Sequence, residues 1–96
     1  MKDKKIIVFG LGYVGYSLSI MLSRYYKVIG IDIDQQKIDL VNNNKPTVYD
    51  SEISEWLKSY DLNLSAKKYS TSDLNSDFII ICLPTDHYSQ LEDRLL

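Results

Sequence analysis

A glycine pattern set between two short apolar runs constrains the fold of this chain more than any other feature. Residues 5–9 consist of Lys5 followed by four apolar residues, three of them β-branched. Three glycines follow in the spacing Gly-x-Gly-x-x-Gly, namely Gly10, Gly12 and Gly15. A second apolar run, over 27–32, ends in the acidic residue Asp32. This order predicts a strand, a tight turn, a helix and a second parallel strand.

Each glycine has a separate role in such a turn. Gly10 lets the chain turn tightly, Gly12 lacks the Cβ that would block a pyrophosphate, and Gly15 lets the helix lie close to the strand. The helix then begins with its backbone N–H groups and positive dipole end directed at the phosphates. Asp32 is placed to accept hydrogen bonds from a ribose diol. The pattern therefore predicts a dinucleotide site, and the alternative is a tight turn that binds no ligand.

The composition excludes several classes of function. The chain has 96 residues, 45% of them hydrophobic, and a formal net charge of −2, which predicts a single small globular domain over residues 1–96. A slightly acidic chain gives no support for nucleic-acid binding, and no apolar run approaches the roughly 20 residues that span a bilayer. Cys82 is the single cysteine, which excludes an internal disulfide and a multi-cysteine metal site. A reducing, cytoplasmic location is expected.

Later segments predict further elements of the same sheet. The patterns predict helices over 13–25, 35–43 and 51–60, and strands over 66–70 and 78–83. The first helix is expected to bury the stripe Leu18, Met21, Leu22 and Tyr25, and Asp34 is expected to cap the second helix. The apolar strand 78–83 is expected to be fully buried. We therefore expect an α/β fold of Rossmann type, truncated to about four parallel strands in the order 3-2-1-4, with helices on both faces.

Ligands of such sheets bind beyond the carboxyl ends of the strands. Three features are expected to meet at that edge: the turn from Gly10 to Gly15, Asp32, and the pair Pro84-Thr85 that follows the last strand. Their convergence strengthens the prediction of a dinucleotide site.

The chain also resembles a known family over about residues 4–86. The resemblance rests on Gly-Leu-Gly-Tyr-Val-Gly over 10–15, on Gly30 to Asp34 with Lys37, on Lys45 to Ile53, and on Cys82 to Thr85. These segments are similar to those of the UDP-glucose/GDP-mannose dehydrogenase family. The resemblance implies an NAD-binding domain, and a two-step oxidation of a nucleotide sugar to the uronate with two NAD⁺ in cell-surface polysaccharide synthesis.

The family pattern also implies roles for single residues. Tyr13 and Val14 would line the phosphate turn, and Thr85 would contact the cofactor near the nicotinamide. Asp32 and Lys37 would hold the adenosine ribose, although a solvated helix charge is an equal reading of Lys37. Asp32 favours NAD over NADP because a carboxylate would repel a 2′-phosphate.

The chain departs from the family in its length. Family members are several times longer, and the resemblance implies that their catalytic cysteine, its helper residues and the substrate domain lie beyond the matched region. Cys82 is not that cysteine, because a thiol inside an apolar strand has a raised pKa and is inert. His87 is expected to be solvated. We therefore expect a fragment that binds NAD weakly and does not catalyse, with an open apolar sheet edge that favours homo-oligomers.

Three alternatives stay open at this point. The chain could be a stand-alone regulatory module that binds NAD or another nucleotide without chemistry. It could belong to another dehydrogenase class, such as the hydroxyacid type, although Tyr13-Val14 and Pro84-Thr85 argue against that reading. It could also be a structural remnant that binds nothing.

Overall fold

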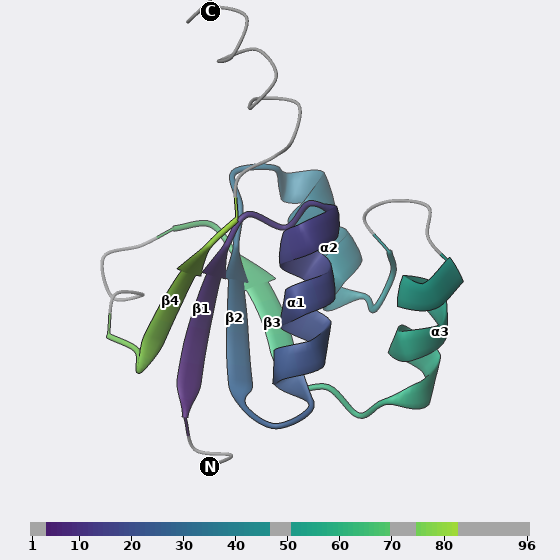
Figure 1. The fold of residues 1–96 in the computed structure, drawn as a ribbon. Coiled ribbons are helices and arrows are strands. Elements are labelled where there is room, and N and C mark those ends of the chain that lie inside the picture. Colours follow the sequence, from purple (N-terminus) through teal and green to yellow (C-terminus); the bar gives the residue numbers. More distant parts are fainter. Residues whose placement is uncertain (1–3, 47–50, 70–74, 83–96) are drawn as a thin grey trace, which may run out of the picture.

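The fold is a four-stranded sheet with three helices in the part of the chain that the computed structural model describes, residues 4–46, 51–69 and 75–82 (Figure 1). In chain order the elements are β1 (Lys5–Phe9), α1 (Tyr13–Ser23), β2 (Lys27–Ile31), α2 (Gln35–Asn42), α3 (Ser51–Ser59), β3 (Leu64–Lys67) and β4 (Phe78–Ile81). Most boundaries agree with the prediction to within two residues. No helix among these residues is long and apolar enough to cross a membrane.

All strand pairs are parallel, in the order β3-β2-β1-β4. This confirms the predicted order 3-2-1-4 and the Rossmann-type α/β class. Val8 in β1 lies in register with Gly30 in β2 and with Ile80 in β4. Because the strands are parallel, β1, β2 and β4 all end at one edge of the sheet, where the predicted site residues follow them.

Helices α1 and α2 pack on one face of the sheet, the face that carries Val8, Gly30 and Ala66, and α3 packs against α1. Both β1-to-β2 and β2-to-β3 connections run in the same direction across the sheet, so right-handed crossovers place their helices on the same side. The opposite face carries an isoleucine cluster that includes Ile7 and Ile29. The predicted helices on that second face have no counterpart among the described residues.

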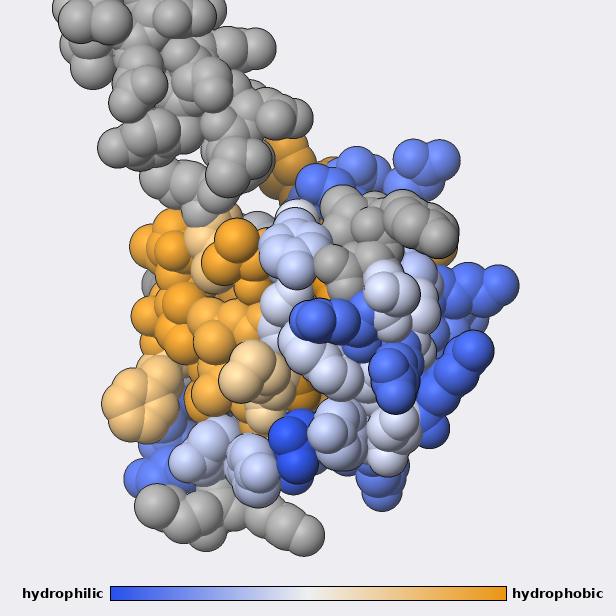
Figure 2. All heavy atoms as spheres, turned by 45° about the vertical axis from the view of Figure 1, so that its right-hand side comes forward, coloured by the Kyte–Doolittle hydropathy of each residue, from blue (hydrophilic) through white to orange (hydrophobic). Residues whose placement is uncertain are grey.

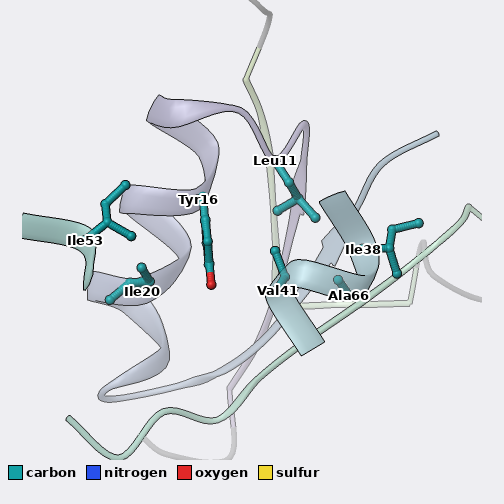
Figure 3. Packing of buried hydrophobic residues seen from close by; sticks show 7 residues of the cluster. All are labelled: Leu11, Tyr16, Ile20, Ile38, Val41, Ile53 and Ala66. Carbon is teal, nitrogen blue, oxygen red and sulfur yellow. The ribbon is translucent and has the colours of Figure 1, made fainter. Parts of the chain in front are cut away.

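A cluster of buried residues joins the helices to the sheet: Leu11, Tyr16, Ile20, Ile38, Val41, Ile53 and Ala66 (Figure 3). Tyr16 is fully buried, and its hydroxyl donates a hydrogen bond of 2.9 Å to the carbonyl oxygen of Lys45. Burial raises the pKa of Tyr16 to about 12. Trp56 is half-buried and packs against this cluster from α3.

The predicted inner stripe of α1 is wrong at Met21 and Tyr25, whereas Leu22 is half-buried against the sheet residues Ile6, Val8 and Val28. Met21 is 53% exposed and Tyr25 is 56% exposed. The buried face instead consists of Gly15, Tyr16, Ser19, Ile20 and Ser23. Small side chains let the helix backbone approach the sheet closely, and the two serine hydroxyls bond to carbonyl oxygens of their own helix, with Ser19 Oγ 2.7 Å from the Gly15 oxygen.

Strand β3 runs over Leu64–Lys67, two residues before its predicted start at 66. Its outer side is occupied by the side chain of Asn42, at the end of α2. The Ala66 N–H donates to Asn42 Oδ1 at 2.8 Å, and Asn42 Nδ2 donates to the Ala66 oxygen at 3.0 Å. The amide thus pairs with Ala66 as a neighbouring strand would.

The prediction of a fully buried last strand is also wrong. Within β4, Phe78 is 60% exposed, Ile79 is 43% exposed and Ile81 is 69% exposed. Its one strand partner among the described residues is β1, and β4 lies at the sheet edge farthest from α3 (Figure 1). Ile80 is half-buried against the cluster under α1, but the other side chains of this edge strand are open to water whatever their hydropathy.

Candidate functional site

The glycine turn leaves the end of β1 in a conformation that only glycine adopts easily. Gly10 has a φ of +95° and donates a hydrogen bond of 2.8 Å to the carbonyl oxygen of Ile31. A Cβ on Gly10 would overlap the carbonyl oxygen of Cys82, and a Cβ on Gly15 would overlap the carbonyl oxygen of Gly10. Both glycines are therefore required by the packing of the fold itself.

Gly12 differs from these two glycines. It is the N-cap of α1 with a φ of −73°, which any residue adopts, and a Cβ there would meet no atom within 4 Å. Nothing in the described structure explains a glycine at this position by packing or strain. The space beside Gly12 is open, and the helix end has no side-chain cap. This arrangement fits a pyrophosphate that approaches the backbone at the N-terminus of α1.

Asp32 lies directly beside the glycine turn. Its Oδ2 accepts a hydrogen bond of 2.8 Å from the N–H of Leu11, and its Oδ1 accepts one of 2.9 Å from the N–H of Asp34. Each carboxylate oxygen can accept a second hydrogen bond. The two backbone donors therefore fix the orientation of the carboxylate while leaving it able to accept hydrogen bonds from a ribose.

The structure brings several other predicted residues to the same edge. Tyr13 and Val14 begin α1 and are 49% and 56% exposed. Lys37 lies near the start of α2 and is half-buried. The N–H of Cys82, just after β4, bonds to the carbonyl oxygen of Phe9 at 2.8 Å, so the chain leaves β4 beside the turn. Thr85 and Pro84 lie outside the described residues.

Residues 4–93 match the NAD binding domain of the UDP-glucose/GDP-mannose dehydrogenase family. The chain belongs to this family. Its similarity to curated members extends over most of its length. UDP-glucose 6-dehydrogenase from Campylobacter jejuni is 37% identical over 94 residues, which cover 91% of this chain and 23% of the relative. UDP-N-acetyl-D-mannosamine dehydrogenase from Methanococcus vannielii is 34% identical over 85 residues, which cover 88% of this chain and 20% of the relative.

A solved structure of the family supports the same assignment. A ternary complex of GDP-mannose dehydrogenase from Pseudomonas aeruginosa matches with a TM-score of 0.72 and 33% identity, over 88% of this chain and 20% of that chain. The chain spans about a fifth of the length of such relatives. The relatives carry the names of three different nucleotide-sugar dehydrogenases, so they show the family and its NAD-binding domain without selecting a sugar.

Cys82 has the properties of a packed thiol. Its side chain is half-buried against the apolar cluster under α1, and burial raises its pKa. A thiol with a raised pKa is protonated at neutral pH, and the protonated form is a poor nucleophile. The predicted inert state of Cys82 agrees with this environment.

One contributor to the site was missed in the sequence. Leu11 fixes Asp32 through its backbone N–H, a contact that no side-chain pattern indicates.

Proposed function

We propose that the glycine turn and Asp32 bind NAD⁺, and that the chain supplies the cofactor-binding part of a nucleotide-sugar 6-dehydrogenase. One observation carries the proposal: the N–H of Leu11, inside the turn, lies 2.8 Å from Asp32 Oδ2. A ribose held by Asp32 would therefore have its phosphate beside Gly12, where the backbone is open. The family assignment supports NAD as the dinucleotide.

Each site residue has a role in this proposal. Gly12 lets the pyrophosphate approach the start of α1, and Tyr13 and Val14 line that approach. Asp32 and Lys37 hold the adenosine ribose, with the Asp32 carboxylate disfavouring the 2′-phosphate of NADP. By the family pattern, Thr85, which lies outside the described residues, would contact the cofactor near the nicotinamide.

The proposed reaction belongs to the complete enzyme. UDP-glucose or a similar nucleotide sugar would be oxidised at C6, first to the aldehyde and then, with water, to the uronate, and each step would pass one hydride to one NAD⁺. The expected cytoplasmic location and the role in polysaccharide synthesis are part of this proposal. We propose that the 96 residues alone bind NAD⁺ weakly and do not catalyse, because covalent aldehyde oxidation needs an activated nucleophile. NADH formation from UDP-glucose by the purified chain would contradict this.

Replacing Asp32 tests the site directly. Asp32→Ala is expected to weaken NAD⁺ binding by about 1–3 kcal/mol, since the ribose hydroxyls lose a charged acceptor. Isothermal titration calorimetry measures the change. Asp39→Ala is the matched control, because it removes a carboxylate of the same charge from the exposed side of α2. An Asp32→Ala variant with the affinity of the unmodified chain would remove Asp32 from the site.

We also propose that the chain associates with a second copy through β4. Figure 2 shows apolar residues gathered on one side of the molecule and hydrophilic residues on the other. An apolar hollow of about 420 Å³ lies between β4 and α1. Its lining includes Ile6, Leu22, Tyr26, Phe78 and Ile80. Ile79 and Ile81 are exposed on the other face of the strand. Among the described residues β4 pairs only with β1, and an apolar edge strand favours pairing with another strand.

Sedimentation analysis of a charged variant tests this association. The unmodified chain is expected to sediment above the monomer mass at high concentration, and Ile81→Lys to sediment as a monomer, because a lysine on an edge strand opposes strand pairing. Met21→Lys is the matched control, since Met21 is a similarly exposed apolar residue on α1. A strictly monomeric unmodified chain, or equal dissociation by both variants, would argue against β4 as the interface.

A further inference from the structure

Leu11 lies inside the glycine turn, yet its side chain belongs to the core. The side chain is fully buried, and Figure 3 shows it between Tyr16 on α1 and the α2 residues Ile38 and Val41. The residues on either side of it, Gly10 and Gly12, have no side chains. Leu11 is therefore the residue through which the packing of the core fixes the position of this part of the turn.

The place for the Leu11 side chain depends on Gly30. Gly30 is buried in the middle of β2, where glycine weakens a strand and marks a close approach of other atoms. A Cβ on Gly30 would lie 2.6 Å from Leu11 Cδ2 and 3.0 Å from Leu11 Cδ1. Gly30 has no positive φ, so its backbone does not require glycine. The space taken by Leu11 is the reason for a glycine at this position.

The backbone of Leu11 connects this packing to the cofactor site. Its N–H holds Asp32 Oδ2 at 2.8 Å, and Asp32 follows Gly30 by two residues on the same strand end. Tyr16, Ile38 and Val41 belong to the same buried cluster as the Leu11 side chain, so it has little free space into which to turn away from β2. An atom added at Gly30 therefore presses on the Leu11 side chain in a close-packed cluster, and a shift passed on to the Leu11 main chain would lengthen its bond to Asp32.

We infer that Leu11 and Gly30 form a size-matched pair that positions the phosphate turn and the Asp32 carboxylate for NAD⁺. This inference rests on the proposed function. Leu11 acts as a positioning residue, because its side chain is buried in the core and acts on the cofactor only through the turn and Asp32. The pair determines how well the site is organised before the cofactor arrives.

Three variants of the 96-residue chain test the pair. Gly30→Ala is expected to raise the NAD⁺ dissociation constant about tenfold in calorimetry. In the ligand-free protein it is also expected to speed hydrogen exchange of the Leu11 amide about tenfold, as the bond to Asp32 weakens. Leu11→Val removes the carbon atoms closest to Gly30. The double variant Leu11→Val with Gly30→Ala is expected to return both quantities to within about threefold of the unmodified chain.

Ile20→Val is the control for stability alone, because Ile20 lies in the same buried cluster on α1 and has no contact with Asp32 among those described. It is expected to change neither the dissociation constant nor the exchange of the Leu11 amide. The inference is overturned if Gly30→Ala leaves both quantities unchanged, if Ile20→Val matches its effects, or if the double variant is no better than Gly30→Ala. Absence of NAD⁺ binding by the unmodified chain would instead refute the proposed function, and the amide exchange would still test the pair.

Discussion

A Gly15→Ala variant is expected to lose about 2–3 kcal/mol of unfolding free energy, measured by urea denaturation. The added Cβ would overlap the carbonyl oxygen of Gly10 and lie 2.8 Å from its carbonyl carbon. Gly10 cannot move away freely, because its N–H is bonded to Ile31 in β2. Alanine returns about 1 kcal/mol through its higher helix propensity, which is too little to offset a backbone overlap.

The control for Gly15→Ala is Ser17→Ala on the same helix. The hydroxyl of Ser17 bonds only to the Tyr13 carbonyl of its own helix among the contacts described, so this change is expected to alter stability by about 0.5 kcal/mol or less. An unfolding midpoint of Gly15→Ala equal to that of the control would show that α1 can move away from β1 at little cost. The close approach of helix and turn would then have no part in the stability of the fold.

A Gly12→Val variant is expected to differ from Gly15→Ala: its NAD⁺ affinity should fall strongly and its stability only a little. Stability should fall by about 1 kcal/mol, because valine is a poorer N-cap residue than glycine. No larger loss is expected, since a Cβ at Gly12 meets no atom of the described residues within 4 Å and the φ of −73° suits any residue. NAD⁺ affinity should fall about 100-fold, because the side chain would fill the space proposed for the pyrophosphate. Calorimetry and urea denaturation on the same preparation measure both quantities.

Gly12→Val and Gly15→Ala together distinguish a ligand-binding glycine from a folding glycine. If Gly12→Val binds NAD⁺ as the unmodified chain does, the pyrophosphate does not pass over the turn, and the proposed cofactor position is wrong. If Gly12→Val is strongly destabilised, the open space at Gly12 is filled in solution, and its glycine serves the fold after all.

The glycine spacing and the acid after the second strand were sufficient to predict the main architecture. They are local signals: Gly10, Gly12 and Gly15 allow one kind of turn, and parallel strands then place Asp32 at the same edge. The observed hydrogen bond from Leu11 to Asp32 confirms that the turn and the acid meet. The roles of all the predicted site residues in binding NAD⁺, those of Lys37 and Thr85 included, stay predictions.

Two errors have a common physical cause. On α1, hydropathy favoured Met21 and Tyr25 as inward residues, whereas the helix turns Gly15, Ser19 and Ser23 towards the sheet because small residues allow a closer contact. Hydropathy reports how much a side chain gains from burial, and it does not report how closely two backbones approach. In β4 it likewise could not tell an edge strand from a central one, because that depends on what packs on both sides.

The role of Leu11 could not be predicted from the sequence pattern, for a different reason. Its contribution comes from a main-chain N–H, which every residue except proline possesses. The space that Gly30 leaves for the Leu11 side chain is what places the Leu11 N–H beside Asp32. A glycine inside a strand, here Gly30, indicates a close approach of other atoms, but the sequence does not show that the partner is Leu11.

The two edges of the sheet differ in a way that limits how large an assembly can become. At the β3 edge, the amide of Asn42 already satisfies the outward N–H and C=O of Ala66. At the β4 edge, the apolar strand is exposed. When two copies pair through β4, as proposed, both outer edges of the joined sheet are β3 edges. The Asn42 amide opposes further strand addition there, so the association ends at a closed pair and does not extend into a fibre.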